Sequence, residues 1–195
     1  MSKISAAIIT YNEEKNIERC ISSLVNVADE IVVIDSGSED KTREIALKLG
    51  AKVIINKFEG HIQQKNFAIT QTSNEWVISL DADEALSNDL NKSIVKTKKK
   101  LEGNGYKFNR LTNYCGKWIK HCGWYPDTKL RLFKKGKGSW KGKNPHDKFI
   151  LDSGKEIYLK GDILHYTFYE VSEHKAQIVK FSEIAAQSLF ELNKK

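Results

Sequence analysis

Short apolar runs alternate with helical patterns in the first part of the chain, and this alternation most limits the folds it can adopt. The apolar runs are residues 5–10, 30–34, 51–55 and 76–80, and each has the length of a buried strand. The segments between them carry apolar residues at helical spacing. A βαβαβαβ order implies right-handed crossovers and a parallel sheet with helices on its faces. The sequence therefore predicts an α/β fold.

Local signals mark the ends of the expected helices. Asn12 has the side chain of a helix N-cap, and the acidic residues Glu13 and Glu14 after it favour a helix N-terminus. Asp40 is a second expected cap, and Gly50 is expected to end the helix that follows it. One apolar stripe follows the first cap at helical spacing and is expected to face the core: Ile17, Cys20, Ile21, Leu24 and Val25.

Polar residues follow three of the four expected strands. These residues are 10–13, 35–38 and 81–83. Because the carboxyl ends of parallel strands lie at one edge of a sheet, we expect the three groups to form a single crevice. Open α/β sheets bind their ligands at such an edge.

The fourth strand ends in two aspartates. Residues 76–84 read WVISLDADE, so Asp81 and Asp83 follow the apolar run and Glu84 comes next. Two carboxylates at this position suit a hard divalent cation, which keeps other coordination sites for water and substrate phosphates. A strand end followed by a helix-capping turn would explain the same residues without a metal. The residues alone leave both interpretations open.

Size and composition are typical of one globular domain. The chain has 195 residues, 40% of them hydrophobic, and four tryptophans, which is enough for a buried core. It has no apolar run of about 18 residues, as a transmembrane helix needs, and no secretory signal pattern follows Met1. The three cysteines are odd in number, and Cys20 is expected to be a buried core thiol. We expect a single domain in a reducing, cytoplasmic compartment.

The positive charge, +7 at pH 7, is concentrated in two lysine clusters. One interpretation is attraction to an anionic membrane surface or to a phosphorylated glycolipid, which would place the protein at the inner face of the membrane. A second is nucleic-acid binding, but no recognised motif accompanies the charge, so we expect no nucleic-acid partner. The third is an ordinary solvated surface. The clusters are Lys96, Lys98, Lys99 and Lys100, and Lys134, Lys135, Lys137, Lys141 and Lys143.

Four linked motifs within residues 3–90 resemble the family 2 glycosyltransferases, which have the GT-A fold. The motifs are IITYNEEKNI, IVVIDSGSEDKT, QQKNFAI and WVISLDADE. The later segments WYPDTKLRLF, NPHDKF and LHYTF resemble a subgroup that builds lipopolysaccharide cores. The resemblance implies inverting transfer of a sugar from a nucleotide-sugar, most simply a UDP-sugar, to a hydroxyl of a cell-envelope glycolipid or saccharide. It also implies one glycosyltransferase domain, with a nucleotide-sugar-binding half at residues 1–100 and an acceptor-side half at 101–195.

The resemblance also implies roles on the donor side. Asp83 would ligate a divalent cation, Mn²⁺ or Mg²⁺, and Asp81 would contact the ribose or a metal-bound water. His165 matches a place where some family members have a third metal ligand, and packing at a strand end is its alternative. Many relatives carry a second Asp where this chain has Ser36. The residues matched to nucleotide or donor contacts are Thr10, Tyr11, Glu13, Asp35, Ser38 and Lys65, with solvation on a helix surface as the alternative for Lys65.

Inversion requires a general base on the acceptor side. The resemblance favours Asp147, in NPHDKF, with His146 either orienting it or acting as the base itself. A turn with a capping Asp is the alternative. Trp118 and Trp124 are expected to stack on a sugar or to pack in the core. Arg131 is expected to contact a phosphate, or to be a half-exposed strand arginine.

The remaining segments give weaker signals. Residues 171–195 carry an apolar stripe and are expected to form one helix that packs on its own domain, with a dimer contact or a membrane surface as alternatives. Cys115, His121 and Cys122 lack the paired spacing of a zinc site, so we expect none there.

Two other functions fit parts of the pattern. A nucleotidyltransferase shares the layered fold and an acidic metal site, but it needs a glycine-rich basic loop where this chain has TYNEE after the first strand. A non-catalytic module that binds a nucleotide-sugar is the second alternative. The intact DAD motif and the candidate base argue against it.

Overall fold

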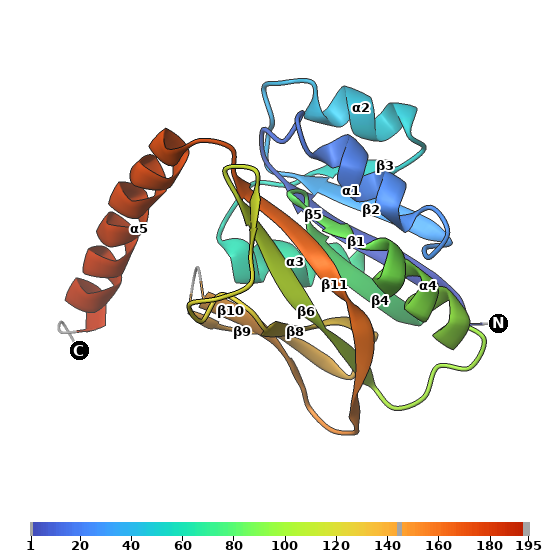
Figure 1. Cartoon of the computed structure of the whole chain (residues 1–195). Coiled ribbons are helices and arrows are strands. Elements are labelled where there is room, and N and C mark those ends of the chain that lie inside the picture. The colour runs from blue at the N-terminus through green and yellow to red at the C-terminus, as the bar shows by residue number, and fades with distance from the viewer. Residues whose placement is uncertain (1, 144–145, 193–195) are drawn as a thin grey trace.

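The computed structural model describes residues 2–143 and 146–192, and Figure 1 shows their arrangement. The strands are β1 (Ile4–Thr10), β2 (Glu30–Asp35), β3 (Lys52–Ile55), β4 (Trp76–Asp81), β5 (Glu84–Leu86), β6 (Gly105–Tyr114), β7 (Lys117–Ile119), β8 (Asp127–Lys134), β9 (Gly138–Lys143), β10 (His146–Leu151) and β11 (Glu156–Phe168). The helices are α1 (Ile17–Leu24), α2 (Thr42–Lys48), α3 (His61–Thr70), α4 (Asn88–Thr97) and α5 (Val171–Leu192).

Over the described residues, one sheet contains most of the strands in the order β3-β2-β1-β4-β8-β6-β11-β5, with β7 beside β6. The N-terminal part, from β3 to β4, is entirely parallel, which confirms the predicted βαβαβαβ order. The sheet then continues with β8 antiparallel to β4, and with β6 and β11 parallel to each other. β9 and β10 pair in a separate hairpin. The predicted α/β class is confirmed.

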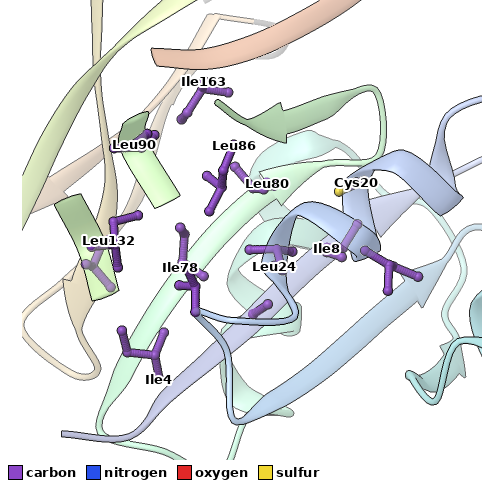
Figure 2. Close-up of a cluster of buried hydrophobic side chains, with 14 of the residues drawn as sticks. Ile4, Ile8, Cys20, Leu24, Ile78, Leu80, Leu86, Leu90, Leu132 and Ile163 are labelled. Atoms are coloured by element: carbon purple, nitrogen blue, oxygen red, sulfur yellow. The ribbon is translucent and has the colours of Figure 1, made fainter. Parts of the chain in front are cut away.

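β1 is buried along its whole length because helices cover both faces of the sheet. Ile4, Ala6 and Ile8 point to the face covered by α1, α2 and α4. Ala7 and Ile9 point to the opposite face, toward α3 and the β9–β10 hairpin. Figure 2 shows the first of these clusters, in which the predicted stripe residues of α1 meet the sheet. Burying one such aliphatic side chain stabilises the fold by about 1.5–3 kcal/mol.

The strand register brings the predicted polar groups to one edge. Thr10, at the end of β1, pairs with Asp35 at the end of β2. On the other side of β1, Ile9 pairs with Asp81 at the end of β4. The three strands therefore end together, as the sequence predicts.

The predicted start of the first helix is wrong. α1 begins at Ile17, and Asn12 has a φ of 54°, which is left-handed, whereas an N-cap residue typically has an extended backbone. Asn12 instead joins two loops: its Oδ1 accepts the Glu39 N–H at 2.8 Å, and its own N–H donates to Ser38 Oγ at 2.9 Å. Val25, expected to face the core, is exposed because it follows the last helical residue.

Several lysines of the two clusters have structural partners. Lys98 is buried, with its Nζ 2.8 Å from the Val27 carbonyl oxygen and 2.6 Å from Asp29 Oδ2. Lys134 pairs with Glu75 at 2.8 Å, and Lys135 Nζ donates to the Thr72 carbonyl at 2.6 Å. These three side chains have partners within the fold, so a smaller part of the lysine excess remains for a partner surface.

The predicted C-terminal helix is present, but its expected packing is wrong for the residues described. α5 extends away from the sheet in Figure 1. Ile178 and Val179 are exposed, and contacts near its start hold it, such as the one at 3.1 Å between Tyr114 Oη and His174 Nδ1. No helix in residues 2–143 and 146–192 combines the length and apolarity needed to cross a bilayer.

Candidate active site

The turn between β4 and β5 carries the DAD motif and is fixed from several sides. Glu84 Oε2 accepts the Asp81 N–H at 3.0 Å. The Ala82 N–H donates to the Ile9 carbonyl of β1 at 3.2 Å. The buried Cys20 of α1 donates its S–H to the Asp81 carbonyl at 3.7 Å, so the predicted core thiol also supports this turn. The turn therefore has little freedom to move its two carboxylates.

Asp83 lies against His165. Its Oδ2 is 3.0 Å from His165 Nε2, and its carbonyl accepts the Tyr166 N–H at 2.9 Å. β11 pairs with β5 in the register His165 to Glu84, which places the histidine beside the DAD turn. Burial opposes a charged imidazole, but the neighbouring Asp83 carboxylate outweighs burial, so the pKa of His165 is raised.

Lys65 of α3 joins two carboxylates. Its Nζ lies 3.1 Å from Asp81 Oδ1 and 2.8 Å from Asp147 Oδ2, and 4.5 Å from the centre of the Trp140 ring. Lys65 is buried, so solvation on the helix surface does not apply to it. Burial alone would raise the pKa of Asp81, but the Lys65 ammonium and the Arg131 guanidinium outweigh it and hold this pKa well below its usual range.

Arg131 differs from both expectations. It is buried, and its Nη2 lies 2.9 Å from Glu84 Oε1 and 3.5 Å from Asp81 Oδ2, while Nη1 donates to the Ser79 carbonyl at 3.3 Å. A guanidinium enclosed in this way by carboxylates and a carbonyl has no exposed group for a phosphate. Its place in the structure is that of a support for the DAD turn.

The residues matched to the nucleotide lie around the ends of β1 and β2. Asp35 is fully buried, and its carboxylate accepts the N–H groups of Gly37 and Ser38 and the Ser38 hydroxyl. Its oxygens therefore shape the loop after β2. Tyr11 is exposed, whereas Thr10 is buried and its hydroxyl has no hydrogen-bond partner among the described residues.

Glu13 stands between these loops and the DAD turn. Burial and, next, the Asp83 carboxylate raise the pKa of Glu13 to about 7. Its Oε2 accepts from the Asn16 side chain at 2.7 Å. This raised pKa identifies a position where negative charge is crowded.

Two hollows flank the contact between Asp83 and His165. The first hollow, about 340 Å³, is lined by Asn12, Glu13, Asp40 and Asp83 on one side and by Tyr166 and Tyr169 on the other. The second hollow, about 300 Å³, is lined by His165 together with Arg110, Thr112, Trp124, Asp127 and Phe168. Asp83 lines the first hollow and His165 lines the second, so their contact lies at the boundary between the two hollows.

Asp83 and His165 are the candidate ligands for a divalent cation at this boundary. Among the described residues, His165 Nδ1 is buried without a hydrogen-bond partner, and Nε2 of the same ring lies 3.0 Å from Asp83 Oδ2, so an imidazole and a carboxylate lie side by side here. No group of three acidic, histidine or cysteine side chains forms a ready-made cage in the part of the chain described. The donor set therefore suits a cation that takes its other ligands from substrate and water.

The structure brings only some of the residues predicted for the acceptor side close to one another. Asp147 pairs with Lys65, which also contacts Asp81. The side chain of His146 lies outside the described residues. Trp124 lines the second hollow. Trp118 packs against Tyr166 at 5.3 Å between ring centres and lines neither hollow identified within the described residues.

Sequence reasoning missed the contribution of Glu84 and Arg110. Glu84 is fully buried and pairs with Arg131 at 2.9 Å and with Arg110 at 3.6 Å. Arg110 in turn pairs with Asp127 at 2.9 Å. An acidic residue at the start of the short buried strand EAL was the available signal, because a buried carboxylate requires a cationic partner.

The chain is similar to known glycosyltransferases. It is 52% identical over 92 residues, 47% of this chain and 31% of the relative, to an uncharacterized glycosyltransferase of Rickettsia bellii. It is 28% identical over 204 residues, 98% of this chain and 73% of the relative, to the lipopolysaccharide core biosynthesis glycosyltransferase LpsC of Rhizobium meliloti. The chain spans about a third of the length of the Rickettsia relatives it matches.

A solved structure has the same fold. The crystal structure of residues 1–349 of TarS from S. aureus aligns with a TM-score of 0.52 at 20% identity, over 68% of this chain and 47% of that one. TarS has also been solved in complex with UDP and with UDP-GlcNAc. At this identity the likeness concerns the fold, and it agrees with the expected GT-A architecture. The sequence model of the family described as "Glycosyl transferase family 2" matches residues 5–149. The protein therefore belongs to glycosyl transferase family 2.

Proposed function

We propose that this protein transfers a sugar, with inversion, from a UDP-sugar to a hydroxyl of a cell-envelope saccharide such as a lipopolysaccharide core. The observation that carries the proposal is the contact between Asp83 and His165 at the boundary of the two hollows. In this proposal the first hollow receives part of the donor and the second receives the acceptor.

Asp83 and His165 would hold a divalent cation on the donor side. When bound, the cation stabilises the negative charge that develops on the diphosphate leaving group. A donor set of one carboxylate and one imidazole favours Mn²⁺ over Mg²⁺, because Mg²⁺ prefers oxygen ligands in a strict octahedron. Thr10 and Tyr11 would contact the nucleotide, and Asp35 and Ser38 would fix the loop beside it.

Asp147 would act as the general base that takes the proton from the acceptor hydroxyl. Its side chain is only 7% exposed, and the Lys65 contact at 2.8 Å holds the carboxylate in one orientation. Because the same lysine contacts Asp81, the base lies within one side chain of the DAD turn. This placement supports a base close to the reacting carbon of the donor sugar.

The similarity to LpsC, over nearly the whole chain, supports a lipopolysaccharide core saccharide as the acceptor class. TarS binds UDP and UDP-GlcNAc, which makes UDP the first nucleotide to test. An acceptor of this kind would be met at the inner face of the membrane, where the exposed lysines of the two clusters would favour anionic lipids.

The test is a calorimetric titration of UDP into the protein with Mn²⁺, with Mg²⁺ and with EDTA. We expect binding that requires the metal and is tighter with Mn²⁺. GDP, CMP and dTDP are titrated in parallel, and transfer from UDP-sugars to lipopolysaccharide cores is followed by mass spectrometry. A folded protein that binds none of these nucleotides with either metal would overturn the proposal in favour of a non-catalytic module.

A further inference from the structure

The second hollow has the size and lining of a small ligand site. Its volume of about 300 Å³ lies at the lower end of the range of about 300–1,000 Å³ typical of small-molecule pockets. It therefore suits one ring better than an extended chain. Its lining combines the apolar side chains of Trp124 and Phe168 with the polar side chains of Arg110, Thr112 and Asp127.

Trp124 offers an exposed aromatic surface next to another ring. Its side chain is 38% exposed, and its ring stands perpendicular to that of Tyr114 at 6.0 Å between centres. Tyr114 is itself held by Phe168, at 5.7 Å, and by His174, at 5.4 Å. An indole that is supported on one side and exposed on the other can stack on the C–H face of a sugar without further ordering.

The charged side chains of the lining are already paired. Arg110 Nη2 lies 2.9 Å from Asp127 Oδ2, and Arg110 Nη1 lies 3.6 Å from Glu84. Asp127 also pairs with Lys129 at 2.9 Å. An anionic ligand would have to compete with two carboxylates for Arg110, which costs free energy in a partly buried site. Sugar hydroxyls need no net charge, and they can donate to Asp127 and accept from Arg110 without breaking the pair.

We infer that the second hollow binds one neutral hexopyranose ring of the acceptor, with Trp124 stacked on the ring and Arg110 and Asp127 bonded to its hydroxyls. The inference rests on the proposed function and names the acceptor chemistry at its site. Because His165 lines the same hollow, a ring bound there lies next to the Asp83–His165 contact. A phosphorylated acceptor would carry its phosphate outside this hollow.

The test observes the Trp124 indole N–H by NMR in the protein saturated with UDP and Mg²⁺, which is diamagnetic and does not broaden signals near the site as Mn²⁺ would. Methyl glycosides of glucose, galactose and mannose are added, and then glucose 6-phosphate. We expect at least one neutral glycoside to shift the Trp124 signal, and glucose 6-phosphate to bind no more tightly. Glycoside affinity in the variants is measured by calorimetry, because Trp124→Ala lacks the indole signal, and this variant should bind the glycoside on the order of tenfold more weakly. Trp118→Ala is the matched control, because Trp118 is also 38% exposed and lines neither hollow among the described residues.

The results separate this inference from the proposed function. UDP binding is measured on the same variants, and it should be unchanged in both. If UDP binds but no neutral glycoside shifts Trp124, or if Trp118→Ala weakens glycoside binding as much as Trp124→Ala, the inference is wrong and the proposed function stands. Tenfold tighter binding of glucose 6-phosphate would also overturn it. Failure of UDP to bind the wild-type protein counts against the proposed function and also overturns the inference, since no acceptor site remains to assign.

Discussion

His165 Nε2 lies 3.0 Å from Asp83 Oδ2, although the two residues are 82 positions apart in the sequence. The contact exists because β11 returns beside β5, at the turn that carries the DAD motif. Each half of the chain thus contributes one of the two side chains at the boundary between the hollows. The N-terminal half alone would leave Asp83 without this partner.

Replacing Asp83 with Ala should abolish metal-dependent UDP binding, since it removes the carboxylate that would ligate the cation. Replacing His165 with Ala should weaken Mn²⁺-dependent binding by about 10–100-fold and Mg²⁺-dependent binding less, because the nitrogen ligand matters more for Mn²⁺. Calorimetry with each metal measures both effects. Asp152→Ala removes a carboxylate from the surface hairpin and is the control. Equal losses with the two metals in His165→Ala would contradict the ligand role of this histidine.

Asp147→Asn should leave UDP binding nearly unchanged and lower kcat by about 10²–10⁴-fold, as expected for the loss of a general base. The amide keeps the shape of the side chain, and its oxygen can still accept from Lys65. Steady-state transfer rates and the donor KM, measured with the same acceptor, separate catalysis from binding. Full turnover in this variant would show that another group is the base.

Glu84→Gln should destabilise the fold by about 3–5 kcal/mol, because it leaves Arg131 buried with a weakened partner. Glu84 is fully buried and pairs with Arg131 at 2.9 Å. Glu75→Gln is the matched control: this side chain is 62% exposed and pairs with Lys134 at 2.8 Å. A surface pair of this kind contributes about 0–1 kcal/mol. Urea unfolding measures both, and similar losses would refute the structural role of Glu84.

Glu13→Gln should stabilise the metal-free protein at pH 8 but not at pH 5. The pKa of Glu13 is about 7 in the fold against 4.5 for the ordinary group, so folding favours its protonated form. The stability that the protonated side chain gives to the folded state is fully present below the unfolded pKa, and it is lost as the pH rises through 7. Because the carboxylate is partly exposed, we expect a gain on the order of 1–2 kcal/mol at pH 8.

Urea unfolding in EDTA at the two pH values checks this expectation. Glu18→Gln, on the exposed face of α1, controls for removing a negative charge from the same region. If the difference in unfolding free energy between Glu13→Gln and wild type does not change with pH, the pKa of Glu13 is not raised by the fold.

The sequence predicted the donor half well because its signals are local. Strand length, helical spacing and polar residues at strand ends are properties of short segments, and they placed residues 10–13, 35–38 and 81–83 at one edge before any contact was known. Asn12 was misassigned because its side chain suits both an N-cap and a left-handed turn, and the contact with Ser38 and Glu39 decides between them.

The charge pairing at the site depended far more on tertiary structure. The sequence named Lys65 as a donor contact and Arg131 as a phosphate contact, but only the fold shows that Arg131 is enclosed by Glu84 and Asp81, and that Lys65 joins Asp81 to Asp147. The sequence by itself therefore determined the α/β order, the crevice and the family resemblance. The tertiary structure decided which charges pair, which tryptophan lines a hollow and where α5 lies, because burial and charge pairing arise from residues distant in the chain.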